Sequence, residues 1–255
     1  MHMPAKQQTN TSINTEPITN ATACAKASAK LEQSDLLQLP QVLSPGMIAF
    51  EDDYLLIIDK PAGMLIHPTV SQWEGTLYDL VKNYYARNGI IANIHPVSRL
   101  DRNTSGLVIF AKEPIIQFWL SQQDVVKEYY AIAQGHIAQP HGLIDAPIAR
   151  REGSIIERCV DFARGKAAQT AYTVLGYYGA NTLVRLRLFT GRTHQIRVHM
   201  AHLGHPLVDD NLYGTPGPQS RHALHAFRLA FKHPVGDMML EITRALPEDL
   251  RKILY

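Results

Sequence analysis

Cysteine is scarce in this chain of 255 residues, which contains only Cys24 and Cys159. Two cysteines so far apart match neither a disulfide framework nor the spacing of a zinc or redox motif. The chain also lacks an apolar run of the roughly 18–20 residues that a membrane-spanning helix requires. Its first residues lack the basic-then-apolar layout of a secretory signal. These absences predict a reduced, cytoplasmic protein with no membrane partner.

Net charge is also small, at +2, which by itself argues against a nucleic-acid partner. The charge is unevenly distributed, however, because residues 146–205 contain nine Lys or Arg against three Asp or Glu. A positive field concentrated on part of a surface is typical of proteins that bind phosphates. The segment therefore indicates a nucleic-acid contact, with a solvated basic face as the alternative.

The composition changes near residue 45. Residues 1–45 are rich in Thr, Asn, Gln, Ala and Ser, so they cannot bury enough apolar surface to offset the entropy of ordering. We expect a flexible tail there and one folded domain over residues 46–255. Within that domain, apolar runs and alternating patterns predict strands at 54–58, 107–111, 127–135, 168–177 and 182–190.

Helices are expected between these strands. Thr76 is a suitable N-cap for a helix that ends before Gly89. Pro114 is placed at the first position of a second helix, which is expected to bury Ile115, Phe118 and Trp119. Strands and helices do not follow a strict βαβ order. The pattern therefore favours an α+β fold with a mixed, mostly antiparallel central sheet and flanking helices.

The stretch from His95 to Lys112 places Asp101 between Arg99 and Arg102, followed by an Asn-Thr-Ser-Gly turn and an apolar strand. Nearby positive charge favours the ionised form of a carboxyl group. An ionised carboxylate suits a nucleophile, an electrostatic stabiliser or a metal ligand, but not a general acid. For an isolated Arg-x-Asp-Arg, the more frequent explanation is a surface salt bridge.

Two further motifs follow. Lys127-Glu-Tyr129-Tyr-Ala131 would by itself be an ordinary strand, on which the two tyrosines face opposite sides of the sheet. The motif Gly191-Arg-Thr-His-Gln-Ile-Arg-Val-His199 predicts a helix capped by Thr193 that runs to about Leu203. On that helix one face carries His194, Arg197 and Ala201, and another carries Ile196, Met200 and Leu203.

Histidines are dense in this helix and just after it, which raises the alternative of a metal site. The sequence contains no His-Glu-x-x-His pair, and no Cys or carboxylate completes a ligand set before residue 209. Packing, capping and RNA contacts are the favoured uses, and we expect no metal. The histidines concerned are His194, His199, His202 and His205.

Taken together and in this order, the motifs resemble those of the RluA-type pseudouridine synthases. The resemblance covers residues 47–250, and it includes the Asp-Lys-Pro-x-Gly element at 59–63 and the segments 204–214 and 221–234. Two departures are visible. Ser98 stands where the family commonly has His, and Asp209-Asp210 stands where the family usually has Gly-Asp.

The resemblance implies roles for the charged residues. In the family, the loop Arg-Leu-Asp-x-x-Thr-Ser-Gly presents the catalytic aspartate, which here is Asp101. The arginine that ends the Gly-Arg-x-His-Gln-Ile-Arg motif forms a salt bridge with that aspartate, and this position is Arg197. Arg192 is the alternative for this partner, and otherwise a phosphate contact.

The resemblance also implies how a uridine is held. Tyr129 matches the tyrosine that stacks on the target base, and Arg99 is placed to fill the gap that a flipped nucleotide leaves. Leu224 is expected to line the uracil pocket. Extrusion of the base is required because its C6 and glycosidic bond cannot be approached within a helical stack.

The implied activity is the conversion of uridine to pseudouridine in structured RNA, either large-subunit ribosomal RNA or transfer RNA. It needs no cofactor. The chain is expected to be a monomer, and residues 1–45 are too few and too polar for the S4 domain that related enzymes often carry. Asp101 can add to C6, attack C1′ or remove the C2′ proton, and the sequence does not separate these routes.

Two other classes of function remain open. One is an RNA-binding protein that keeps the fold without catalysis. The other is a glycosidic hydrolase with paired carboxylates, which needs a second carboxylic acid with a raised pKa. The sequence marks no such partner for Asp101.

Overall fold

The computed structural model describes residues 39–70, 72–218 and 221–255. Its helices are α2 (Leu77–Arg87), α3 (Pro114–Gln122), α4 (Gln195–His202) and α5 (Glu248–Arg251), with short 3-10 helices η2 (Pro45–Met47) and η3 (Lys252–Leu254). Its strands are β1 (Ile48–Glu51), β2 (Leu55–Lys60), β3 (His95–Pro96), β4 (Ser105–Ala111), β5 (Val126–Gln134), β6 (His141–Asp145), β7 (Ile148–Arg150), β8 (Arg158–Val160), β9 (Gln169–Tyr178), β10 (Asn181–Leu188), β11 (Leu224–Lys232) and β12 (Met239–Thr243).

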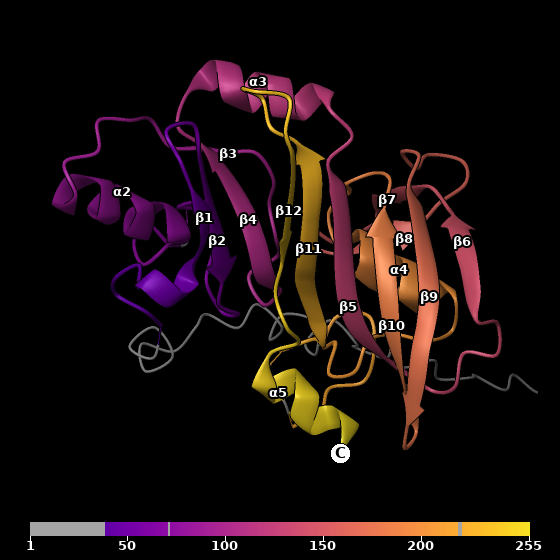
Figure 1. The fold of residues 1–255 in the computed structure, drawn as a ribbon. Coiled ribbons are helices and arrows are strands. Elements are labelled where there is room, and N and C mark those ends of the chain that lie inside the picture. Colours follow the sequence, from indigo (N-terminus) through magenta and orange to yellow (C-terminus); the bar gives the residue numbers. More distant parts are fainter. Residues whose placement is uncertain (1–38, 71, 219–220) are drawn as a thin grey trace, which may run out of the picture.

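Ten of the described strands form one long sheet, which crosses the whole molecule in Figure 1. Its main order is β1-β2-β4-β11-β5-β10-β9-β6, with β12 paired to β11 and β3 paired to β4. Only the β4–β11 pair among these is parallel; the other ladders are antiparallel. The predicted α+β fold with a mixed, mostly antiparallel central sheet is confirmed.

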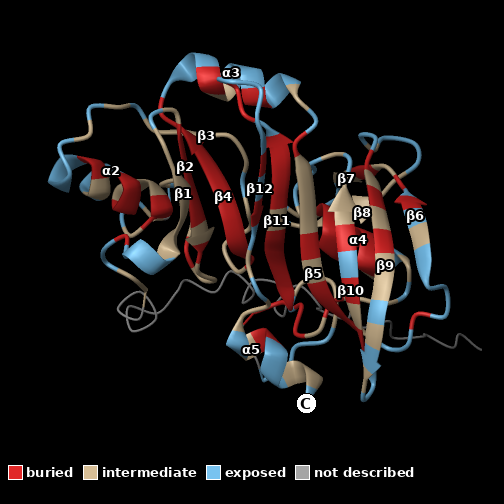
Figure 2. Ribbon diagram, in the orientation of Figure 1, coloured by how far each residue is buried: buried red, intermediate tan, exposed pale blue. Residues whose placement is uncertain are grey.

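Helices cover both faces of the sheet. On one face α2 packs against β2 and β4 through alternate residues such as Ile58 and Val108. On the other face α3 packs against the intervening residues of the same strands, such as Ile57 and Ile109. Helix α4 packs against β5, β10 and β11. The buried strands thus run through the middle of the fold, and the outer strands β6 and β9 are more exposed (Figure 2).

The two halves of the sheet meet at the segment before Asp101. Leu100 packs against two buried clusters. The α2 cluster includes Ile58, Leu80 and Val108, and the α4 cluster includes Tyr129, Ile196 and Leu224. Ala226 belongs to the α4 cluster and lies opposite Gly106 of β4. Helices α2 and α4 therefore lie on the same face of the sheet, over opposite halves, with the Asp101 loop between them.

The expectations for the first two helices fare differently. Thr76 caps α2 as predicted, because its side chain accepts from the Asp79 backbone while Asp79 accepts from the Thr76 backbone. Pro114 begins α3 as predicted. The prediction of the buried face of α3 was wrong, because apolar side chains occupy most of the circumference of this helix and periodicity does not select one face. Ile115, Phe118 and Trp119 are exposed, and Ile116 and Leu120 are buried instead.

Residues 1–38 of the expected tail lie outside the described residues. Within the described part, Leu39 and Leu43 pack against the cluster beneath α2. No helix of the described residues is long and apolar enough to cross a membrane.

Gly106 permits the close contact between β4 and β11. Its φ is +115°, and a Cβ atom there would lie 2.2 Å from the carbonyl oxygen of Ala226. We expect Gly106→Ala to lower the free energy of unfolding by about 1–3 kcal/mol more than Gly89→Ala, because overpacking adds to backbone strain. Gly89 is the matched control, since it also has positive φ but faces open space. Chemical denaturation of the two variants checks this, and equal losses would contradict it.

Candidate active site

A cavity of about 670 Å³ opens between the Asp101 loop, strand β5 and the start of α4. Residues 96–102 form one wall, and residues 191–197 form another. The cavity brings together five segments that are far apart in the sequence. All five predicted site residues line it, namely Arg99, Asp101, Tyr129, Arg197 and Leu224.

The backbone of the Asp101 loop is held by a buried lysine. Lys60 is 1 % exposed, and its Nζ donates to the carbonyl oxygens of Arg102, Pro61 and Met64, each at 2.9 Å. Burial lowers the pKa of Lys60 to about 7. The Thr104 backbone N–H closes the turn by donating to the Asp101 carbonyl at 3.1 Å. The loop is thus fixed at its backbone while the carboxylate projects into the cavity.

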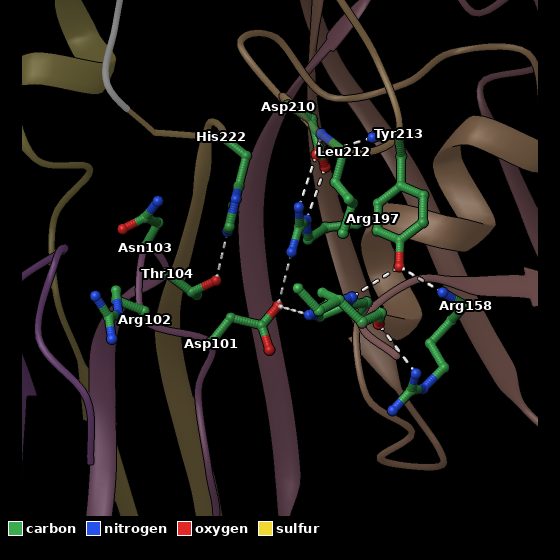
Figure 3. Close-up of polar contacts among 12 residues, drawn as sticks. Asp101, Arg102, Asn103, Thr104, Arg158, Arg197, Asp210, Leu212, Tyr213 and His222 are labelled. Atoms are coloured by element: carbon green, nitrogen blue, oxygen red, sulfur yellow. Dashed lines mark hydrogen bonds and ion pairs between the residues drawn. The ribbon is translucent and has the colours of Figure 1, made fainter. Parts of the chain in front are cut away.

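Two buried histidines support the end of the same loop. His222 Nε2 lies 2.8 Å from Thr104 Oγ1 (Figure 3), and His225 Nδ1 lies 2.9 Å from Ser105 Oγ. Burial lowers the pKa of His222 to about 3 and that of His225 to about 4. Both rings are therefore neutral at neutral pH, and they act as hydrogen-bonding supports for the loop.

These lowered pKa values predict acid sensitivity. Unfolded histidines bind protons below about pH 6.5, whereas these folded ones stay neutral, so the unfolded state gains protons first. The free energy of unfolding should have its full value above about pH 6.5. It should fall by at most about 2 kcal/mol for each ring between that pH and pH 5. Denaturation at pH 7 and pH 5 checks this. The double variant of His222→Gln and His225→Gln should lose less on acidification, whereas exposed His136→Gln should behave like wild type.

Arg197 is held mainly by a second carboxylate (Figure 3). Its Nε and Nη2 donate to the two oxygens of Asp210 at 2.8 and 2.7 Å. Its remaining Nη1 lies 3.4 Å from Asp101 Oδ2. The guanidinium also lies 5.0 Å from the ring centroid of Tyr213. The predicted contact between Arg197 and Asp101 is therefore present, through the one edge of the guanidinium that Asp210 leaves free.

The flanking arginines do not hold Asp101 as the sequence suggested. Among the described residues, Asp101 forms an ion pair with Arg197 at 3.4 Å, and the ring of His194, whose pKa is lowered by burial, lies 3.9 Å away. Figure 3 shows Arg102 on the far side of the loop from the Asp101 carboxylate. The reason is local geometry, because neighbouring residues in a tight turn project in different directions.

His194 is brought to Asp101 by an unusual start to α4. It is the N-cap of the helix, with a left-handed φ of 58° and no side-chain capping bond. The predicted cap at Thr193 was wrong. Instead, Gln195 Oε1 accepts from the Arg192 backbone at 2.9 Å and fixes the approach to the helix. His194 Nδ1 lies 2.7 Å from the hydroxyl of Tyr213, so Tyr213 contacts both groups that face Asp101.

Known proteins share this fold and are similar to this sequence. A family model described as RNA pseudouridylate synthase matches residues 54–202. The chain belongs to the RNA pseudouridylate synthase family. The RluA-type resemblance that the motifs indicated is thereby confirmed.

The relatives of this pseudouridine synthase family member include bacterial enzymes. Ribosomal large subunit pseudouridine synthase D of Nitrosomonas europaea is 39% identical over 224 residues, covering 82% of this chain and 64% of that protein. The chain thus spans just under two thirds of that relative's length. The protein of the same name from Yersinia pestis is 36% identical over 245 residues, covering 89% of this chain and 74% of that protein. The solved structure of human RNA Pseudouridylate Synthase Domain Containing 1 superposes with a TM-score of 0.64 at 27% identity, covering 80% of this chain and 86% of that one.

The second departure from the pseudouridine synthase motif has a structural explanation. Asp209 replaces the usual glycine and adopts a left-handed φ of 57°, a conformation that Asp tolerates better than most residues. The next residue, Asp210, is fully buried and also accepts from the Leu212 and Tyr213 backbones at 3.0 and 3.2 Å. Sequence reasoning missed the role of Asp210, although its place in the usual Gly-Asp pair was a signal. Ser98, the first departure, lines the cavity.

The two tyrosines of the Lys-x-Tyr motif divide as expected. Tyr129 lines the cavity and packs with Leu224 in the α4 cluster. Tyr130 faces the other side of the sheet, where it stacks on Phe227 with ring centroids 3.7 Å apart. In this pseudouridine synthase fold, only Tyr129 is available to a ligand in the cavity.

Among the described residues, no group of three or more His, Cys, Asp or Glu side chains is arranged to hold a metal ion. The clustered histidines have other contacts. His199 is buried between Thr170 Oγ1 and the Ala146 carbonyl, at 2.8 and 2.9 Å, and His205 Nδ1 lies 2.9 Å from the Gln134 carbonyl.

The pair of carboxylates at the site does not suit a hydrolase. Asp210 is near Asp101, but its hydrogen bonds with Arg197 outweigh burial and hold the pKa of Asp210 below its usual value. A glycosidase acid needs a raised pKa so that it keeps a proton. The geometry thus leaves one carboxylate, Asp101, facing the cavity, and uses the other, Asp210, to hold an arginine.

Proposed function

We propose that this protein isomerises specific uridines in structured RNA to pseudouridine, with Asp101 as the catalytic residue and no cofactor. Large-subunit ribosomal RNA is the proposed substrate, because the bacterial relatives are named for it; transfer RNA is the alternative. The observation that carries the proposal is the position of Asp101. Its carboxylate is 27% exposed in a cavity that Tyr129 also lines, and Arg197 contacts it from one side.

The cavity residues divide the work of holding a uridine. The base must leave its helical stack before its glycosidic bond can be reached. Tyr129 offers an aromatic face for stacking, which is worth about 1–3 kcal/mol per base, and Leu224 forms an apolar wall beside it. Arg99 lines the mouth of the cavity without an ion pair to any described residue, so its guanidinium is available to occupy the space that the flipped nucleotide vacates.

Asp101 acts on the uridine while the protein restrains only its surroundings. The reaction breaks the N1–C1′ bond, turns the uracil and rejoins it through C5, so the carboxylate must contact different atoms in turn. Its contacts with Arg197 and His194, at 3.4 and 3.9 Å, are long for hydrogen bonds. Both contacts reach the same oxygen, Oδ2, so they do not tie up both oxygens of the carboxylate. Addition to C6, attack on C1′ and removal of the C2′ proton all remain compatible with this arrangement.

We propose that the enzyme acts as a monomer, as the RluA-type resemblance implies. We also place it in the cytoplasm, where bacterial ribosomal RNA is made and modified. The basic stretch at 146–205 supports binding of flanking phosphates, because Arg192 of that stretch lines the cavity with an exposed side chain.

The test is release of tritium from C5. RNA labelled with tritium at C5 of uridine is incubated with the protein, since rejoining through C5 must expel that hydrogen. Release from a large-subunit ribosomal RNA transcript is the expected result, and release from transfer RNA alone would reassign the substrate. Binding without release from any cellular RNA would support the RNA-binding alternative and overturn the proposal.

A further inference from the structure

Lys127 is the lysine of the Lys-x-Tyr motif, and it has no role in the proposed function. It lies on β5 two residues before Tyr129, so both side chains face the same side of the sheet. It lines the main cavity and also an adjoining pocket of about 120 Å³, which Asp124, Leu188 and Gly191 help to form. Lys127 therefore stands where the cavity continues past the stacking tyrosine.

The ammonium group of Lys127 has no structural partner. Among the described residues, none forms an ion pair or hydrogen bond with its Nζ. Asp124 is near enough to act on its charge, but that carboxylate lies in ion-pair range of Arg187, at 3.7 Å. The half-buried position lowers the pKa of Lys127 through desolvation. A cation that gives up hydration without a partner is destabilising unless a ligand supplies the opposite charge.

Two buried cations nearby, Lys60 and Arg197, differ from Lys127 because each has partners within the protein. Lys60 donates three hydrogen bonds to carbonyl groups, and Arg197 is matched by Asp210. The charges of Lys60 and Arg197 therefore stabilise the loop and the site. Lys127 makes no such contact with the described residues.

We propose that Lys127 binds a phosphate of the RNA backbone adjoining the target uridine; this rests on the proposed function. Lys127 and Tyr129 lie two residues apart on one strand and line the same cavity. The long side chain of Lys127 can therefore reach the backbone of a nucleotide whose base stacks on Tyr129. The compact ammonium of lysine is suited to phosphate as a point charge.

The test is the salt dependence of catalysis in the Lys127→Met variant, which keeps the apolar stem and removes the charge. With a large-subunit ribosomal RNA transcript, kcat/KM should fall about tenfold at low salt through KM, with kcat unchanged. The slope of log(kcat/KM) against log[KCl] should become shallower by about 0.7–0.9, as for the loss of one phosphate contact. Lys127→Arg should recover the slope.

Lys82→Met is the matched control, because Lys82 is exposed on α2 and does not line the cavity. Its slope should equal that of wild type. The inference is overturned if Lys127→Met keeps the wild-type slope, if its kcat falls as far as its kcat/KM, or if Lys82→Met changes the slope equally. If Lys127→Met melts at a lower temperature than wild type, Lys127→Gln is compared with Lys127→Arg instead. The slope of log(kcat/KM) against log[KCl] should then be shallower for Lys127→Gln than for Lys127→Arg. An inactive wild type would instead refute the proposed function.

Discussion

Asp101→Asn is expected to abolish pseudouridine formation, lowering its rate by more than about a thousandfold. The amide has nearly the same shape as the carboxylate, but it carries no charge and cannot act as a nucleophile or base. The Asp101 side chain is partly exposed and makes only long contacts with Arg197 and His194. Its replacement should therefore leave the fold and the affinity for RNA nearly unchanged. Tritium release and filter binding with the same transcript measure the two effects.

The control is Asp161→Asn, which changes a carboxylate in a surface turn where it pairs with Arg164. That variant should keep wild-type activity. If Asp101→Asn retained substantial activity, another residue would have to be the catalytic group. If it lost RNA binding together with activity, Asp101 would have a structural role instead.

Among the substitutions proposed for this protein, Arg197→Met should lower the free energy of unfolding most, and it should also lower activity strongly. It leaves Asp210 fully buried without its guanidinium partner, and breaking a buried ion pair from one side costs about 3–5 kcal/mol. It also removes the cation that contacts Asp101. Denaturation measures the free energy of unfolding, and single-turnover tritium release measures the chemical step.

Arg228→Met is the matched comparison. Arg228 also joins two carboxylates, Glu128 and Glu241, at 3.0 and 2.9 Å, but Glu241 is largely exposed. Its loss should cost about 1 kcal/mol or less and leave activity intact. Equal losses of stability in the two variants would show that Asp210 can remain buried without its arginine at little cost. That result would contradict the stabilising role given to the ion pair between Arg197 and Asp210.

The sequence predicted most of the site because each motif places its functional residue within a few positions of a recognisable turn or strand. Asp101 begins the turn that leads into β4, and Tyr129 lies on a strand whose alternation fixes its side. Asp210 escaped prediction for a physical reason. Its role depends on a guanidinium thirteen residues earlier, and the left-handed Asp209 that orients it is not visible in any periodic pattern.

Local sequence patterns also failed to predict the buried face of α3 and the N-cap of α4. Helix α3 has apolar side chains around most of its circumference, so its buried face is set by the position of β2 and β4 rather than by its own sequence. The N-cap of α4 moved by one residue because the side chain of Gln195 satisfies the preceding backbone. In both cases tertiary contacts outweighed a local preference.

The parallel pair of β4 and β11 has a consequence for how the protein becomes active. The ladder between the two strands has only two residue pairs, at Ser105 and Gly106, directly after the Asp101 loop. Asp101 belongs to one side of this junction, whereas Tyr129 and Arg197 belong to the other. Residues about a hundred positions apart in the chain must therefore meet before catalysis is possible, and such distant contacts form slowly. During refolding, enzymatic activity should return later than helical and sheet signals, so that catalysis itself reports the docking of one half of the molecule on the other.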